Sequence, residues 1–280
     1  MRRSKLILLV LLALMSANCT AQIEKPKSRT NILSISRQNC VRILIANKPV
    51  GSGFFIHESY VATCCHVITA TVSGDPKQKK FKWEPHANIF VLCANGEIIE
   101  ATCVSQPTKE DISPLVRDFA VLKLKNEPKD KATILPFFDW KQTPSIGSEV
   151  YFSGYPLGAP TMLTHEGMVS GLAANDNIVC IQAPINKGNS GSALLNANGE
   201  ILGVLSMREG GISKGLKQLR DHIAKTESRG SISMMGVDQL QSTKEIVNVL
   251  DLYISTGIGY ARTIKHLAAY VQRHKIIKGK

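Results

Sequence analysis

The sequence predicts a mainly β protein, a sandwich or a barrel, with a helical section near its C-terminus. From about residue 37, short apolar runs alternate with turn residues, as in CVRILIA, GSGFFI and YVATCCHVI. Asn95-Gly96 lies between NIFVLC and EIIEATCV, and Asn-Gly between apolar runs is a strong hairpin signal. The series continues with DFAVLKL, EVYFSGY, GMVSGL, IVCIQAP and EILGVLSM. Many short strands at regular spacing, with no helical period before residue 210, indicate this fold class.

The pattern changes to helical spacing after residue 210. One helix is predicted within 213–226, where Leu216, Leu219 and Ile223 recur at helical intervals. A second is predicted from the capping-box sequence Ser242-Thr243-Lys244-Glu245, followed on one side by Ile246, Val249, Leu250 and Tyr253. TGIGYA then predicts one more strand. From Thr263 an amphipathic surface helix is expected, with one apolar stripe formed by Ile264, Leu267, Ala268 and Val271.

The N-terminus predicts export from the cytoplasm. Residues 1–21 combine Arg2, Arg3 and Lys5 with an apolar run and the small residues of SANCTA, as in a secretory signal peptide. Cys19 allows the alternative of a lipoprotein signal and a lipid anchor. Residues 22–36 form a mostly polar lead-in, and no later apolar run is long enough to span a bilayer. We therefore expect an extracytoplasmic protein, in the periplasm, at the cell envelope or secreted.

Charge and cysteine content give no support for nucleic-acid binding or a zinc site. The net charge is +12, but the basic residues are scattered apart from a C-terminal cluster, and no nucleic-acid motif is present. Six of the seven cysteines follow the signal region, and an oxidising compartment permits disulfides whose pairing the sequence leaves open. No Cys-x-x-Cys spacing indicates zinc. We expect no metal and no cofactor.

Three segments carry candidate catalytic chemistry. Gly188-Asn189-Ser190-Gly191 has glycines on both sides of a serine, and a serine nucleophile needs such close backbone approach, a base and oxyanion donors. His66 ends the apolar strand VATCCH, and Asp118 directly precedes FAVLKL. Taken singly, each is as typical of a turn or a structural residue. Together they give the order His, Asp, Ser, each at the edge of an apolar strand.

In these segments the chain resembles the trypsin-like serine peptidases, and most of all the bacterial HtrA-type protease domain. The resemblance covers GSGFFI with VATCCHV, ANGEIIEATCV with DFAVLKL, GYPLG, GMVSGL, INKGNSGSALLNANGEILGVLS and GIGYARTIKHLAAYV. It implies two antiparallel six-stranded β-barrels over residues 37–280 and a C-terminal helix. Because the sequence stops just past that helix, at IIKGK, we expect no PDZ domain in it. Ser190 would be the nucleophile, His66 the base and then the acid, and Asp118 the residue that orients His66. The amides of Gly188 and Ser190 would form the oxyanion hole.

The sequence departs from the family pattern in two places. Ser192 stands where HtrA proteins have glycine, and residues 208–255 insert two helices before the last strand. The substrate pocket is predicted at Leu205, Ser206 and Met207. Leu205 replaces the histidine that glutamyl endopeptidases use, and Pro184 replaces the acid expected for Lys/Arg cleavage. A small or medium apolar side chain is therefore the predicted preference.

The predicted function is a serine endopeptidase that hydrolyses proteins or peptides through an acyl-enzyme. Two alternatives remain open. One is a catalytically silent trypsin-like fold that serves as a binding or scaffold protein. The other is a hydrolase with Cys64 or Cys65 as nucleophile, disfavoured because side-chain directions alternate along a strand. The oligomeric state and the natural substrate stay undetermined.

Overall fold

Two closed six-stranded β-barrels form the body of the protein, as the sequence analysis predicted. A computed structural model describes residues 27–75, 80–105, 117–173, 177–208, 214–226, 233–234, 236–253 and 257–277. All neighbouring strands with a given register are antiparallel. In the first barrel the order is β1 (Cys40–Ile45), β2 (Lys48–His57), β3 (Tyr60–Thr63), β8 (Ala120–Leu124), β7 (Ile98–Cys103) and β6 (Ile89–Leu92). In the second it is β10 (Leu163–Ala173), β11 (Ile178–Gln182), β16 (Ile258–Thr263), β13 (Ile201–Arg208), β12 (Ala193–Asn196) and β9 (Glu149–Gly154).

The local sequence explains why these strands form. The predicted Asn-Gly hairpin joins β6 to β7, and Gly96 adopts a φ of +90° at the turn. Along β7, Ile99 and Ala101 are buried while Ile98 and Glu100 are exposed, which is the alternation of a strand with one face on the core. An additional two-stranded ribbon, β4 (Thr69–Asp75) with β5 (Lys80–Pro85), was not predicted.

The expected polar lead-in contains a helix, α2 (Arg29–Asn39), so a helix does precede residue 210. Ser28 caps its first turn, because the Ser28 hydroxyl accepts from Asn31 N at 3.3 Å. Its buried face is formed by Ile32, Ser36 and Asn39. Two of these are polar, and for that reason the segment shows little apolar periodicity. Asn39 Nδ2 donates to the carbonyls of Phe55 (2.8 Å) and Thr133 (2.7 Å), which satisfies its burial.

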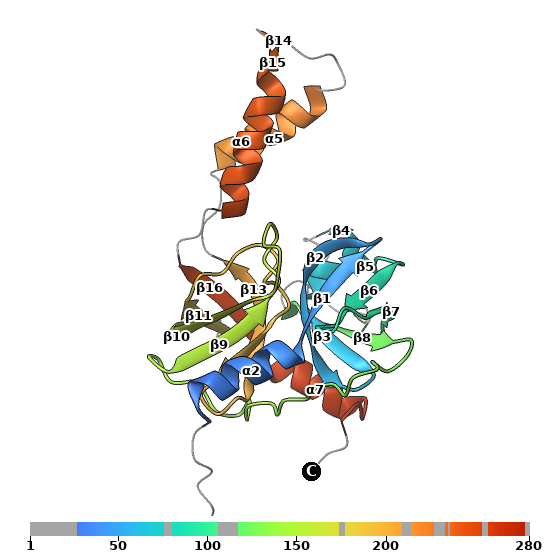
Figure 1. Cartoon of the computed structure of the whole chain (residues 1–280), viewed down its shortest axis with the longest axis vertical. Coiled ribbons are helices and arrows are strands. Elements are labelled where there is room, and N and C mark those ends of the chain that lie inside the picture. The colour runs from blue at the N-terminus through green and yellow to red at the C-terminus, as the bar shows by residue number, and fades with distance from the viewer. Residues whose placement is uncertain are drawn as a thin grey trace, which may run out of the picture.

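The C-terminal helix α7 (Lys265–Arg273) is present as predicted. All four residues of its apolar stripe, Ile264, Leu267, Ala268 and Val271, are buried. They belong to the core cluster that fills the first barrel, although the helix follows a strand of the second barrel. Figure 1 shows α2 and α7 along the same side of the two barrels. The two helices therefore tie the barrels together.

The insertion between β13 and β16 is a helical hairpin of α5 (Lys214–Thr226) and α6 (Gln239–Tyr253), with a small ribbon of β14 (Ser233–Met234) and β15 (Val237–Asp238). It projects away from the barrels (Figure 1). The second helix begins earlier than the capping box predicts, because Asp238 Oδ1 accepts from Gln241 N at 3.0 Å. Ile223 and Val247 are buried, whereas the stripe predicted from Ile246, Val249 and Leu250 is exposed.

The N-terminal segment, the membrane-span prediction and the cysteines are considered together. The signal peptide of residues 1–21, including Cys19, lies outside the described residues. No helix in the described part of the chain is long and apolar enough to cross a membrane. All six described cysteines are free, so no disulfide is formed among them: Cys40, Cys64, Cys65, Cys93, Cys103 and Cys180.

Candidate active site

His66 lies in a single helical turn rather than at the end of a strand. The strand β3 stops at Thr63, and α3 (Cys65–Ile68) follows at once. The strand assignment for VATCCH was therefore wrong in its last residues, and side-chain alternation does not apply there. Cys64 and Cys65 are both buried, at 0% and 2% exposure, where alternation would have buried at most one. The turn leaves His66 exposed beside them.

Asp118 sits two residues before β8 in an uncommon backbone conformation. Its φ is +40°, in the left-handed region that non-glycine residues rarely adopt. Its side chain is nearly inaccessible, with 3% of the residue exposed. Such local strain persists only where the surroundings hold the residue in place. Here the holding contacts are hydrogen bonds to the carboxylate.

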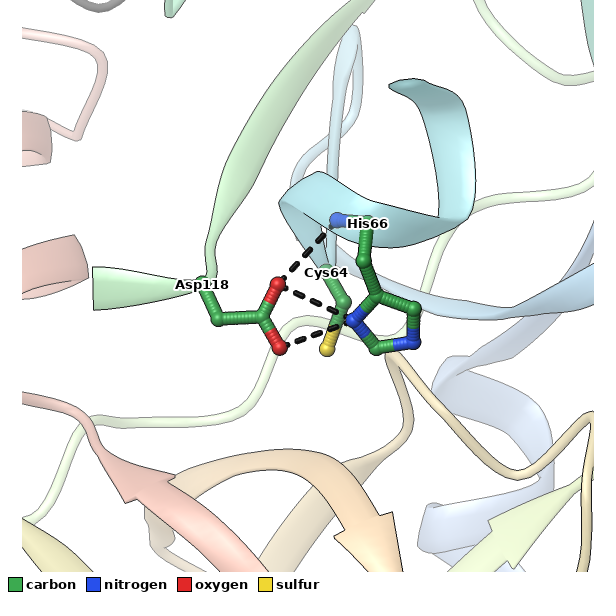
Figure 2. A group of neighbouring side chains, drawn as sticks. All are labelled: Cys64, His66 and Asp118. Atoms are coloured by element: carbon green, nitrogen blue, oxygen red, sulfur yellow. Dashed lines mark hydrogen bonds and ion pairs between the residues drawn. The ribbon is translucent and has the colours of Figure 1, made fainter. Parts of the chain in front are cut away.

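The carboxylate of Asp118 pairs with the imidazole of His66. Asp118 Oδ1 and Oδ2 lie 3.0 and 2.8 Å from His66 Nδ1, and His66 N donates to Oδ1 at 3.1 Å (Figure 2). A buried carboxylate at Nδ1 favours the tautomer with the proton on that nitrogen. Nε2 is then left as an acceptor on the opposite edge of the ring. This is the arrangement of a general base.

The loop that carries Ser190 requires glycine on both sides. Gly188 has a φ of +97°, and a Cβ there would lie 2.3 Å from Tyr155 O. Gly191 has a φ of +92°, and its Cβ would lie 2.0 Å from Ser52 O. Any side chain at either position would collide with backbone, so the sequence Gly-Asn-Ser-Gly is needed for the loop to close.

Two amides of this loop are left without a hydrogen-bond partner among the described residues: those of Gly188 and Ser190. Their neighbours are paired, because Asn189 N donates to Asn186 O (3.1 Å) and Gly191 N to Leu205 O (2.7 Å). The two predicted oxyanion donors are therefore the ones that remain available. Unpaired backbone N–H groups of this kind suit a developing negative charge.

Ser52 of β2 fixes this loop from the other barrel, and the sequence analysis did not identify it. Ser52 N donates to Ser190 O at 2.9 Å, and Ser52 Oγ donates to Gly188 O at 2.7 Å. The same hydroxyl accepts from Tyr155 N at 2.9 Å. The signal in the sequence was GSGFFI, a polar residue between two glycines inside a buried strand.

Ser206 links the serine to the histidine–aspartate pair. Ser190 Oγ donates to Ser206 O at 3.1 Å, and Ser206 Oγ donates to Asp118 Oδ2. In the described structure the Ser190 hydroxyl thus bonds this carbonyl and not the imidazole. A bulge between Leu205 and Met207 leaves Ser206 out of the ladder with β16, and that frees its carbonyl. Two of the predicted catalytic residues are paired directly, and the third joins them through Ser206.

The loop also lies beside the turn that holds the histidine. A Cβ on Gly51 would lie 2.8 Å from the Val67 side chain and 3.1 Å from Ser190 O. Val67 follows His66 directly in α3. Segments far apart in the sequence are therefore brought into one place between the barrels.

Near the serine, the second barrel contributes apolar residues of the predicted substrate pocket. Ile185 lies over Gly259 of β16, where a Cβ would be only 2.0 Å from Ile185 Cδ1. Leu205 is fully buried in the same cluster as Ile185. Met207 pairs with Tyr260 through its backbone, and its side chain is not described.

Comparisons with known proteins identify similar chains. The family described as trypsin-like peptidase domain matches residues 51–204. The serine protease Do-like HtrA of Lactococcus lactis is 29% identical over 225 residues, which is 74% of this chain and 45% of that protein. A probable periplasmic serine endoprotease, DegP-like, of Brucella suis is 29% identical over 227 residues, covering 74% and 39%. The chain thus spans less than half of the curated relatives it matches.

A solved structure is also similar. The serine endoprotease from Yersinia pestis aligns with a TM-score of 0.55 at 23% identity, over 92% of this chain and 70% of that one. At this identity the likeness supports the fold alone. The family match and the fold comparison concern the same two barrels.

Proposed function

Because this chain belongs to the trypsin-like peptidase family, we propose that it is a serine endopeptidase acting through Ser190, His66 and Asp118. The observation that carries the proposal is the Nδ1 contact of 2.8 Å between His66 and a buried carboxylate. It is joined by the serine loop, whose Gly188 and Ser190 amides have no partner among the described residues. That combination supplies a base, its orienting group and oxyanion donors in one place.

The reaction begins when the Ser190 hydroxyl exchanges one acceptor for another. A bound peptide that runs along β13 donates an N–H to Ser206 O and displaces the hydroxyl, which then turns to His66 Nε2. Ser190 Oγ attacks the substrate carbonyl as its proton passes to Nε2. The amides of Gly188 and Ser190 stabilise the oxyanion. His66 then protonates the leaving amine, and water hydrolyses the acyl-enzyme by the same route.

Asp118 acts through His66. Its carboxylate holds the ring tautomer and stabilises the imidazolium that forms when Ser190 loses its proton. The Ser206 hydroxyl and the backbone amide of His66 fix the carboxylate in turn. Low solvent access strengthens these interactions, since the carboxylate is almost fully buried.

We infer a preference for small or medium apolar side chains at the residue before the cleaved bond. The residues beside the predicted pocket are apolar, since Ile185 lies against Gly259 and Leu205 packs in the same buried cluster. Pro184 offers no charge for a basic side chain. A desolvated charge in such a pocket would be costly.

We also propose that the protein works outside the cytoplasm on protein or peptide substrates. The predicted signal peptide of residues 1–21 supports this location, as do relatives described as periplasmic. The lipid anchor at Cys19 is an alternative form of the same export signal. Mass spectrometry of the mature N-terminus distinguishes a lipidated cysteine from a start at residue 22.

Labelling with a fluorophosphonate probe tests the proposed nucleophile. The purified protein should be labelled at Ser190, and the Ser190→Ala variant should not. Both proteins are then incubated with a mixture of unfolded proteins, and the new termini are mapped. Apolar residues should precede the cleaved bonds. A folded protein that takes up no probe would contradict the proposal.

One observation favours a second candidate, a silent trypsin-like fold used for binding. The Ser190 hydroxyl donates to Ser206 O at 3.1 Å and not to the imidazole. If the hydroxyl never leaves that carbonyl, the fold is retained and catalysis is lost. The labelling experiment separates the two candidates, since only the enzyme reacts with the probe.

A further inference from the structure

The Cys64 thiol has no role in the proposed mechanism, although it lies against the histidine–aspartate pair. The residue is fully buried, and its sulfur donates to Leu205 O at 3.0 Å. The sulfur, one ligand nitrogen of His66 and one carboxylate oxygen of Asp118 all lie within 4.8 Å of one another. Figure 2 shows Cys64 together with the carboxylate and the imidazole. Three different metal-ligating groups therefore converge on one point.

The chemistry of these groups matches a soft, tetrahedral cation. Zinc takes thiolate at about 2.3 Å and imidazole or carboxylate at about 2.0–2.2 Å. Tetrahedral ligands at such bond lengths lie about 3.3–3.7 Å apart. The imidazole and carboxylate, now 2.8 Å apart, would part slightly and the sulfur would approach. Cys64 and His66 are two residues apart in the chain, and on binding the sulfur would give up its bond to Leu205 O.

We propose that Cys64, His66 and Asp118 form an inhibitory binding site for a thiophilic divalent cation such as Zn²⁺. The inference rests on the proposed function, because it makes the same histidine the target of regulation. Hard cations such as Mg²⁺ do not suit a thiolate ligand. A water molecule would complete the tetrahedron as the fourth ligand.

Occupation of this site stops the reaction by removing the base. The cation takes the electron pair of Nδ1, the thiol releases its proton to solvent, and the Nδ1 proton is replaced on Nε2. The ring is then neutral with a donor at Nε2, so it has no lone pair left to accept the Ser190 proton. Asp118 is held by the cation instead of orienting the ring. Inhibition should therefore abolish turnover rather than weaken substrate binding.

Access and protonation set the conditions for binding. The His66 side chain is 39% exposed, whereas Cys64 is fully buried, so a cation would enter the site from the His66 side. Burial, chiefly, and the neighbouring Asp118 carboxylate raise the pKa of the Cys64 thiol well above its ordinary value. The thiol is thus protonated when no cation is present, and a coordinating cation deprotonates it. The sequence did not predict this site, because Asp118 is far from Cys64-x-His66 along the chain.

Cys65, the next residue in the chain, provides a matched control. It is also a buried free thiol, but its sulfur lies 3.7 Å from Thr69 Oγ1 and is not a member of the cluster. Replacing either cysteine by alanine removes one thiol from the same turn. Only the replacement at Cys64 removes a ligand.

Cation binding is measured first in the Ser190→Ala background, where no turnover is needed. Cd²⁺ is titrated, and the ultraviolet charge-transfer band of a cadmium thiolate is followed, with Zn²⁺ as competitor. In this background, the protein with both cysteines and the Cys65→Ala protein should show a cadmium–thiolate band from the proposed site. The Cys64→Ala protein should lack that band. Affinity should fall by about 100-fold or more without Cys64, since even losing a partner of a ligand costs about 10- to 100-fold.

Turnover is measured next in proteins that carry Ser190. Zn²⁺ should inhibit peptide hydrolysis and fluorophosphonate labelling of the parent and of Cys65→Ala, and a chelator should restore both. Cys64→Ala should need about 100-fold more Zn²⁺ for the same fractional inhibition. If the Cys64→Ala variant does not fold, the Cys64→Ser variant is used in its place.

The outcomes separate the two proposals. Equal Cd²⁺ bands and equal Zn²⁺ sensitivity with and without Cys64 would overturn the cation site, whatever the activity. A Cys64-dependent band in a protein that never hydrolyses peptides would keep the cation site and reject the endopeptidase. Inhibition that is lost with Cys65 instead of Cys64 would also overturn the proposed ligand set.

Discussion

Replacement of Ser52 by alanine should reduce both stability and activity, although Ser52 lies far from Ser190 in the sequence. The Ser52 hydroxyl donates to Gly188 O and accepts from Tyr155 N, at 2.7 and 2.9 Å. Alanine leaves both buried backbone groups without that partner. Each unsatisfied group costs about 1–3 kcal/mol, so the free energy of unfolding should fall by about 2–6 kcal/mol.

The effect on catalysis follows from the same bonds. Gly188 O is held only 2.7 Å from the hydroxyl, and the peptide that carries it orients the loop of the two oxyanion amides. If the loop turns and one donor is lost, kcat should fall by about 100- to 1,000-fold. KM should change little, because the Ser52 hydroxyl bonds Gly188 O and Tyr155 N and not the residues predicted for the pocket.

The assay is peptide hydrolysis with kcat and KM determined separately, beside urea unfolding. Ser105→Ala is the control, because Ser105 is also a buried serine whose hydroxyl accepts a backbone amide, that of Val121, at 2.7 Å. The control should lose stability and keep kcat. A Ser52→Ala protein that is destabilised but has the kcat of the parent would refute the assignment of Ser52 to the oxyanion loop.

Three further predictions concern the base, the pocket and alkaline stability. Asp118→Asn should fold and lose about 10,000-fold in kcat, because the amide favours the wrong ring tautomer; steady-state kinetics with circular dichroism checks this, and near-normal kcat would contradict the role. Ile185→Ala should shift the kcat/KM ratio toward larger apolar residues by about 10- to 200-fold in peptides that differ at that position; an unchanged ratio would exclude Ile185 from the pocket. Burial raises the pKa of the Cys65 thiol from 9.0 to about 12, so above pH 9 the unfolded chain binds fewer protons than the folded one. The free energy of unfolding should therefore fall as pH rises, by about 1.4 kcal/mol per pH unit for this thiol. Urea unfolding from pH 8 to 11 should show a shallower decline in Cys65→Ala than in the parent, and equal slopes would contradict the shift.

The strand pattern and the site motifs were predictable because they depend on short stretches of sequence. The Asn-Gly turn and the apolar stripe of α7 were each visible within about ten residues, and each formed as expected. The helix α2 was missed, since its buried face carries Ser36 and Asn39, which packing and hydrogen bonds accommodate. The start of α6 was displaced by Asp238, a cap that competes with the predicted capping box.

The sequence by itself determined the class of fold and the three candidate catalytic residues, because each residue lies in a short motif: His66 after VATCC, Asp118 before FAVLKL and Ser190 between two glycines. Only the tertiary structure decided how they meet. Ser52 and Ser206 connect the serine loop to the other barrel and to Asp118 through hydrogen bonds between distant segments. The helical turn at Cys65–Ile68 brought a second thiol inward and placed Cys64 beside the carboxylate. Such contacts depend on how two closed barrels pack, which no short window of sequence contains.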